Sequence, residues 1–158
     1  MNNIQFDYQY RDAYGSKACD YIVFPNPENI SAEEITSRLE QAFWDSEFFI
    51  AGQIRIPELF LYLSDAYDPE IDHCFHHFDS VTIVPDPLTD VHNRTIGEFI
   101  TEVESQASLG WKLFDPWSVA PFHIGHNGGA GTKTIDLPKP SKLACRRSIR
   151  DYSILQLQ

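Results

Sequence analysis

Six side chains that could bind a metal ion or transfer a proton lie within one short stretch of the chain. They are Asp72, His73, Cys74, His76, His77 and Asp79. Imidazole, thiolate and carboxylate groups are the usual protein ligands of zinc and of other divalent transition metals. An imidazole beside a carboxylate is also suited to general acid/base catalysis near neutral pH. We therefore take this stretch as the candidate site.

Two alternative ligand sets follow from the geometry of a strand, in which successive side chains point to opposite faces. An extended chain places His73, His77 and Asp79 on one face and Asp72 and His76 on the other. The strand-based hypothesis is a metal site formed by His73, His77 and Asp79. The loop-based hypothesis is a turn that brings Asp72, His73 and His76 together. A further ligand from elsewhere in the chain could be His92, His123 or His126.

The candidates for catalysis are His73 and His76 as acid/base groups, with Asp72 or Asp79 as a carboxylate partner. A nucleophilic Cys74 would also need a neighbouring base and oxyanion donors, for which the sequence has no motif. Neither a Cys-x-x-Cys nor a His-Glu-x-x-His motif occurs. One alternative is structural, with the histidines hydrogen-bonded at a strand end and Cys74 buried as a small residue. Another is pH sensing, because clustered histidines gain charge below about pH 6.5.

The start of the chain has the pattern of a β-hairpin. Ile4, Phe6, Tyr8 and Tyr10 alternate with polar residues, which is the period of a strand with one buried face. Lys17–Phe24 is rich in strand-forming residues and follows a short polar segment that can form the turn. We therefore expect two antiparallel strands before Pro25.

Two capping boxes predict amphipathic helices. Ser31 and Glu34 precede an apolar stripe, which predicts a helix over Ala32–Trp44. Thr95 and Glu98 begin a second apolar stripe that ends at Gly110. The sequence therefore predicts two helices, each with one face toward the core.

The remaining segments predict strands and short connections. Phe75–Val84 has the composition of a central strand, so the candidate site enters this strand from a loop. Glu47–Ile56 is predicted as two short extended pieces, Leu59–Leu63 as a strand or a short helix, and Trp111–Phe114 as a short edge strand. This order of elements predicts an α+β fold, with a mostly antiparallel sheet and two amphipathic helices packed on one face.

The charge of the 158-residue chain is unevenly distributed. Residues 1–110 contain 20 acidic and 5 basic residues, a net charge of −15, whereas residues 111–158 contain 3 acidic and 7 basic residues, a net charge of +4. Four of the ten prolines and four of the eight glycines lie between Pro116 and Pro140. We therefore expect an acidic α+β domain over residues 1–114 and an irregular, mildly basic C-terminal extension over residues 115–158.

This charge distribution favours a protein partner over nucleic acid, because an acidic surface repels phosphates. The leading hypothesis is a non-enzymatic interaction protein, similar to an immunity or inhibitor protein, that binds a basic protein partner and needs no cofactor. The alternative is a metal-dependent hydrolase centred on residues 72–79, with zinc or another divalent transition metal as its cofactor. Exposed aromatic residues on an edge strand would also support a homodimer.

The cysteines indicate a reducing compartment. Cys19, Cys74 and Cys145 are odd in number and far apart, which argues against a disulfide framework. The first eleven residues have neither a basic start nor an apolar segment, and the longest apolar run, Leu59–Leu63, is far too short to span a bilayer. We therefore expect a cytoplasmic protein that does not contact the membrane.

Two short motifs resemble those of small uncharacterised bacterial proteins. Tyr10-Arg11-Asp12-Ala13 is an aromatic-Arg-Asp turn after a strand-like start, and Asp72-His73-x-x-His76 precedes a strand. The resemblance covers residues 4–114 and implies no activity. Residues 115–158 depart from it.

Overall fold

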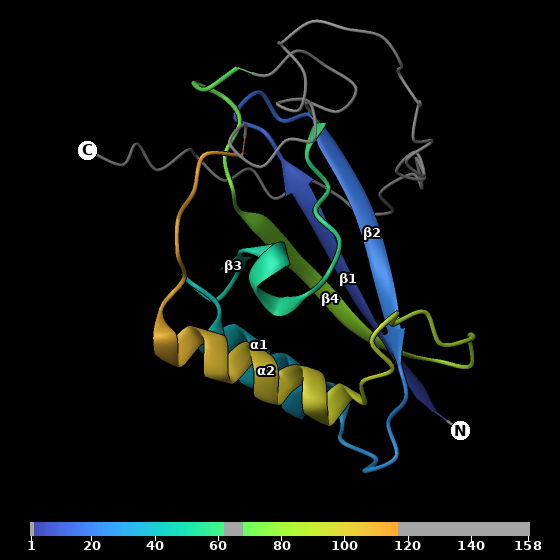
Figure 1. The fold of residues 1–158 in the computed structure, drawn as a ribbon. Helices are drawn as coiled ribbons and strands as arrows, with labels where there is room; N and C mark the ends of the chain where they lie inside the picture. The colour runs from blue at the N-terminus through green and yellow to red at the C-terminus, as the bar shows by residue number, and fades with distance from the viewer. Residues whose placement is uncertain (1, 62–67, 117–158) are drawn as a thin grey trace, which may run out of the picture.

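The computed structural model describes residues 2–61 and 68–116 of the chain. In these residues, four antiparallel strands form one sheet in the order β2-β1-β4-β3, with two α-helices on one side of it (Figure 1). The predicted α+β fold is confirmed. The elements are β1 Asn3–Arg11, β2 Lys17–Phe24, α1 Ala32–Ala42, β3 Phe48–Phe49, the 3-10 helix η1 Ala51–Ile54, β4 His76–Val84 and α2 Ile96–Leu109.

Strand β1 lies between β2 and β4 and supplies the centre of the sheet. Its alternate residues Ile4, Phe6, Tyr8 and Tyr10 are at most 1% exposed, so the predicted alternation is confirmed. The predicted hairpin with β2 is confirmed as well, since Ile4 lies opposite Phe24. Strand β4 is the predicted central strand and begins at His76, the fifth residue of the candidate stretch.

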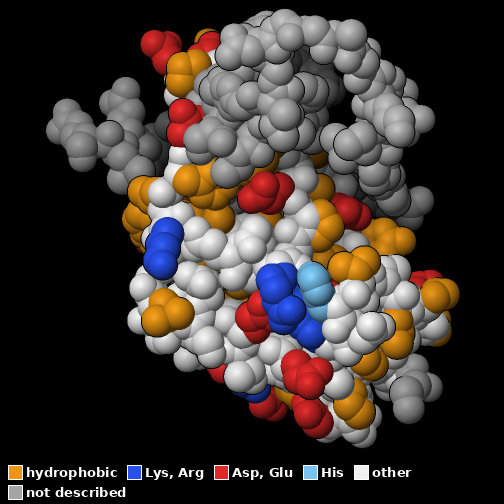
Figure 2. All heavy atoms as spheres, in the orientation of Figure 1, with side chains coloured by type: hydrophobic (Ala, Val, Ile, Leu, Met, Phe, Trp, Pro, Cys, Tyr) orange, Lys and Arg blue, Asp and Glu red, His pale blue; other side chains and the backbone are white. Residues whose placement is uncertain are grey.

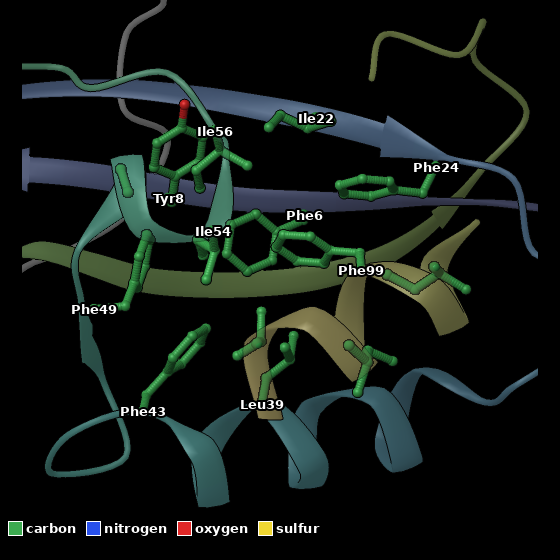
Figure 3. Close-up of a cluster of buried hydrophobic side chains, with 14 of the residues drawn as sticks. Phe6, Tyr8, Ile22, Phe24, Leu39, Phe43, Phe49, Ile54, Ile56 and Phe99 are labelled. Carbon is green, nitrogen blue, oxygen red and sulfur yellow. The ribbon is translucent and has the colours of Figure 1, made fainter. Parts of the chain in front are cut away.

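Aromatic side chains fill the space between the sheet and the helices (Figure 3). Phe6 lies near the centre, with its ring 5.3 Å from that of Phe99 and 5.9 Å from that of Phe49. Phe24 stacks on Phe99 at 4.6 Å, which joins the edge strand β2 to α2. Burial of such large apolar side chains is the main favourable contribution to folding. The core therefore fixes the position of β1 and β4, the strands next to the candidate site.

Both helices begin where the capping residues predict. At α1 the Ser31 hydroxyl accepts a hydrogen bond from the Glu34 amide at 3.2 Å. At α2 the box is reciprocal, because Thr95 Oγ1 accepts from the Glu98 amide at 3.2 Å and the Glu98 carboxylate accepts from the Thr95 amide at 2.8 Å. These bonds satisfy amide groups that would otherwise have no intrahelical partner.

Replacing Thr95 with alanine is expected to lower the free energy of unfolding by about 1 kcal/mol, because it removes the side-chain acceptor of this box. Urea unfolding followed by circular dichroism measures the change. The control is Thr101→Ala, which removes a hydroxyl that bonds only to the Gly97 carbonyl inside the same helix. That variant is expected to be neutral or slightly stabilising. An equal loss in both variants would contradict the role of the cap.

Helix α1 ends two residues before the predicted end. Trp44 leaves the helix and forms a β-bridge with Phe48, in which the two residues exchange backbone hydrogen bonds of 2.8 and 2.9 Å. Between these two residues, Asp45 and Ser46 have positive φ angles and turn the chain. The predicted extension to Trp44 is therefore wrong, because Trp44 pairs with the strand rather than with the last turn of the helix.

Two of the predicted extended segments are also wrong. Glu47–Ile56 contains the short strand β3, but its second half is η1, which buries Ala51 and Ile54 in the core. Trp111–Phe114 forms no strand, because the Gln53 side chain bonds to both backbone groups of Lys112, at 2.6 and 3.0 Å. In Leu59–Leu63, Leu59 and Phe60 adopt no regular secondary structure and Leu61 has 3-10 conformation, whereas residues 62 and 63 lie outside the described residues.

Two further features bear on the predicted organisation. Neither helix of the described residues has the length and apolar character that a bilayer crossing requires. Of the predicted C-terminal extension, only residues 115 and 116 are described, and the rest of that prediction lies outside the described residues.

Candidate functional site

His76 is the deepest residue of the candidate stretch. Its side chain has no exposed surface, and Nε2 accepts a hydrogen bond from the Leu59 amide at 2.9 Å. An accepting Nε2 carries no proton, so the neutral ring is protonated at Nδ1. Nδ1 is buried and has no hydrogen-bond partner in the described part of the chain. Four aromatic rings surround the imidazole at 5.2 to 6.2 Å, those of Tyr8, Tyr10, Phe49 and Phe60.

Burial lowers the pKa of His76 to about 3, and the neighbouring His73 adds to the decrease. An imidazole with this pKa is neutral at physiological pH. It holds the segment around Leu59 against β4 through a hydrogen bond between residues 17 positions apart. His76 therefore serves the packing of the loop rather than proton transfer at neutral pH.

Tyr10, on strand β1, forms hydrogen bonds with both Asp72 and His73. The Tyr10 hydroxyl donates to Asp72 Oδ1 at 3.1 Å and accepts from the His73 amide at 3.1 Å. Asp72 Oδ2 also accepts from the Asp68 amide at 2.9 Å. The Asp72 carboxylate therefore closes the loop that precedes β4 and fixes it to β1.

The imidazole of His73 is partly buried beside Tyr10, with the ring centroids 5.2 Å apart. Its Nδ1 accepts a hydrogen bond from the Phe75 amide at 3.2 Å. Burial and, to a smaller degree, the ring of His77 hold the pKa of His73 below its ordinary value. His73 is therefore held in its neutral form and caps the turn into β4.

The other three groups of the stretch face different surroundings. His77 Nδ1 lies 3.0 Å from the Glu47 carboxylate on the outer face of the sheet. Asp79 is exposed and is the extra residue of a β-bulge, because Asp7 pairs with Ser80 and Tyr8 pairs with Phe78. Cys74 is a free, buried cysteine, and burial raises the pKa of its thiol. A raised pKa disfavours the thiolate that nucleophilic catalysis requires.

The structure brings parts of each predicted ligand set together. In the loop-based set, Asp72 and His73 meet at Tyr10, whereas the imidazole of His76 bonds to Leu59. In the strand-based set, the rings of His73 and His77 are 6.4 Å apart, and Asp79 lies farther along β4. Residues 2–61 and 68–116 contain no group of three His, Cys, Asp or Glu side chains placed to hold a metal ion. His92 lies on an exposed loop, and His123 and His126 lie outside the described residues, so the metal hypotheses stay predictions.

A buried ion-pair network around Arg94 is a feature that the sequence analysis did not predict. The Arg94 side chain is 6% exposed and contacts both oxygens of Asp90, at 2.8 and 3.1 Å, and Glu102 at 2.8 Å. It also donates to the backbone carbonyls of Ile54 and Arg55, at 2.9 and 3.3 Å. The four-residue spacing of Asp90 and Arg94 just before a capping box was the one signal for it.

On the face of the molecule in Figure 2, basic and histidine side chains gather at the centre, and acidic side chains border them. Glu102, which bonds to Arg94, also forms a two-bond ion pair with Arg55, at 2.6 and 2.7 Å. The arginines of this region are therefore matched by carboxylates. Asp90, Glu102 and their two arginines together carry no net charge.

Beside this region lies a cavity of about 280 Å³, which we call the Asp20 pocket. It is formed by the edge of β2, the segment after η1 and the loop before α2. Asp20 is half-buried in it, and burial raises the pKa of its carboxyl group. The lining residues are Asp20, Tyr21, Ile22, Arg55, Pro57, Thr89, Asp90 and Val91.

A second depression, of about 360 Å³, lies where the loop after β2 meets the two helices, and we call it the acidic groove. Glu28 and Glu98 are exposed carboxylates of its lining. The Glu28 carboxylate lies so close to Gly97 that a Cβ atom there would collide with it. This position at the first turn of α2 suits a negative charge, because it lies at the positive end of the helix dipole. The lining residues are Glu28, Ile30, Arg38, Gly97, Glu98 and Thr101.

The basic residue of the acidic groove is already paired. Arg38 forms a two-bond ion pair with Glu104, at 2.7 and 2.8 Å. This bond, together with the nearby charges of Glu34 and Glu28, raises the pKa of Arg38. Glu33 and Glu34 add two more exposed carboxylates on the first turn of α1. The acidic groove therefore keeps an excess of negative charge.

Comparison of the chain with protein-family models, with curated proteins and with solved structures finds no match.

Proposed function

We propose that the chain is a non-enzymatic interaction protein, similar to an immunity or inhibitor protein, that binds a basic protein partner through the acidic groove. The observation that carries the proposal is the excess of exposed carboxylates in and beside this groove. Glu28 and Glu98 line it, Glu33 and Glu34 lie on the first turn of α1, and the one arginine of the lining is already paired. Such a surface attracts a positively charged partner over distances of about 10 Å at moderate salt.

The charge of the whole described region supports the same proposal. Residues 2–61 and 68–116 contain 20 acidic and 6 basic residues. Three of the six, Arg38, Arg55 and Arg94, form ion pairs with carboxylates of the chain. The remaining carboxylates give the body a strongly negative field, which increases association rates with basic proteins more than it increases affinity.

The hydrogen bonds of the candidate stretch favour an interaction role over an enzymatic one. Asp72 and His73 bond to Tyr10, and His76 bonds to Leu59, so these groups act as structural partners. Cys74 is free, but Cys19 is disulfide-bonded. The expectation that the cysteines form no disulfide is therefore wrong, and they do not indicate a reducing compartment. We propose the cytoplasm as the place of the interaction.

The test is a variant in which Glu28, Glu33 and Glu34 are all replaced with glutamine. The wild-type protein and the variant are used to isolate basic proteins from lysate, and each recovered protein is then purified and its Kd measured by calorimetry at two salt concentrations. We expect the variant to bind about tenfold more weakly, because each exposed charge contributes about 0.5 kcal/mol to the pairing. The wild-type affinity is expected to fall as salt increases.

The matched control replaces Asp45, Asp79 and Asp86 with asparagine. These residues are exposed, and none of them lines the acidic groove, so the control has the same net charge as the groove variant. The control is expected to keep the wild-type Kd within about twofold. An equal loss of affinity in both variants would show that net charge, and not the acidic groove, governs binding. An unchanged Kd in the groove variant would also contradict the proposal.

A further inference from the structure

We propose that the Asp20 pocket binds a single alkylammonium or guanidinium group, and that this group is a lysine or arginine side chain of the basic partner. The proposal rests on the proposed function for the source of the cation, and on the pocket itself for the chemistry. It assigns a separate set of residues from those of the acidic groove.

The charges of the pocket select a cation. Of the charged side chains in its lining, Arg55 pairs with Glu102 and Asp90 pairs with Arg94. The carboxylate of Asp20 accepts a hydrogen bond at 2.8 Å from the amide of the neighbouring Tyr21. Among the described residues, Arg55 and Arg94 both form ion pairs with carboxylates, whereas Asp20 forms none. The pocket therefore has one net negative charge.

The partial burial of Asp20 makes this charge useful for binding. Asp20 lies opposite Tyr8 in the sheet, so its carboxyl group points toward the buried face. Burial raises the pKa of this carboxyl group. The charge of Asp20 also contributes to the raised pKa of Tyr8. A carboxylate that has lost part of its hydration gains more from a bound cation than a fully exposed carboxylate does. An incoming ammonium or guanidinium group would restore the solvation that burial removed.

The walls and the size of the pocket suit a flexible side chain with a charged end. Ile22, Pro57 and Val91 provide apolar surface for methylene groups, and Tyr21 adds an aromatic ring. The volume of about 280 Å³ equals the liquid volume of roughly nine water molecules, which accommodates one long side chain. It lies below the usual range for drug-sized ligands, about 300–1,000 Å³.

The first test is an NMR titration of the full chain with agmatine and, separately, with 1-pentylammonium. Both cations are expected to shift the backbone amide signals of Tyr21, Ile22 and Val91, with a Kd of about 1 mM or weaker for so small a ligand. 1-Pentanol has the same alkyl length without the charge and is expected to leave these signals unchanged at equal concentration. The carboxyl pKa of Asp20, followed by NMR, is expected to decrease when agmatine is bound. Shifts of equal size with 1-pentanol, or binding of inorganic phosphate at these amides instead, would overturn the proposal.

The matched variants are Asp20→Asn and Asp86→Asn. The asparagine at position 20 keeps an oxygen that can accept from the Tyr21 amide, so the variant is expected to fold, and a wild-type pattern of remote amide signals checks this. Agmatine binding is expected to weaken at least tenfold in Asp20→Asn and to stay unchanged in Asp86→Asn. An unchanged agmatine affinity in Asp20→Asn would overturn the assignment of the site.

Failure of this proposal can be distinguished from failure of the proposed function. If agmatine binds at Asp20 but no basic protein binds the chain, the pocket is a site for free small amines, and its assignment to a partner side chain is overturned together with the proposed function. If a basic protein binds with the same Kd to Asp20→Asn and to the wild type, the partner assignment is overturned and the proposed function stands. A tenfold weaker Kd for that protein in Asp20→Asn alone supports both.

Discussion

Replacing Arg94 with methionine is expected to lower the free energy of unfolding by about 3–5 kcal/mol, which is the usual cost of removing one partner from a buried ion pair. The guanidinium group contacts two carboxylates and two backbone carbonyls and lies 5.2 Å from the centre of the Phe99 ring. Methionine keeps most of the volume, so the loss reports the hydrogen bonds and the charge. Asp90 would then be a buried carboxylate without its cation.

Urea unfolding followed by tryptophan fluorescence measures this effect, and Arg38→Met is the matched control. Arg38 makes an ion pair of the same geometry with Glu104, but the two side chains are 34% and 40% exposed. Exposed pairs contribute less than about 1 kcal/mol, so we expect a small loss in the control. A lysine at position 94 should recover only part of the loss, because it cannot donate to several partners in one plane. Similar losses in Arg38→Met and Arg94→Met would contradict the importance of burial.

The reason for so large an effect is the position of Arg94 between three parts of the fold. Asp90 belongs to the loop before α2, Glu102 to the helix itself, and the carbonyls of Ile54 and Arg55 to the end of η1. Arg55 has a left-handed conformation with φ of 54°, which ends η1 and turns its carbonyl toward Arg94. The network therefore fixes the wall of the Asp20 pocket as well as the core.

The parts of the fold that could be predicted are those encoded by neighbouring residues. Alternation from Ile4 to Tyr10 and the pair Thr95 and Glu98 are local signals, and both are confirmed. Glu47–Ile56 was misassigned because the spacing of Ile50 and Ile54 fits one helical turn as well as a strand. The irregular path of Trp111–Phe114 depends on Gln53, a partner 59 residues away from Lys112.

The candidate site was predictable in its strand and not in its loop. Alternation does place His76 in the core and His77 on the outer face of β4. The hydrogen bonds of Asp72 and His73 to Tyr10 join residues more than 60 positions apart, and those partners leave no local pattern. The arginine network and the Asp20 pocket were missed for the same reason, because each is assembled from three separate segments.

Acidification is expected to destabilise the protein through His76. Its pKa is about 3 in the folded chain and about 6.5 in the unfolded chain, so the unfolded state binds more protons at every pH between these values. The stabilisation is fully present above pH 6.5 and is lost as the pH falls toward 3. The contribution of this one residue over that range is roughly 4–5 kcal/mol.

The measurement is the free energy of unfolding of the wild type and of His76→Gln between pH 3.5 and 8. Glutamine does not titrate and keeps a side-chain acceptor for the Leu59 amide, so the difference between the two proteins isolates the protonation of His76. Above pH 7 the variant should be less stable by about 1–3 kcal/mol, because its amide donors are buried. Below pH 6.5 this difference should shrink and then change sign, since only the wild type must keep an imidazole unprotonated. The exposed His92→Gln serves as the control, and a difference that is independent of pH in His76→Gln would show that the buried imidazole does not govern the acid response.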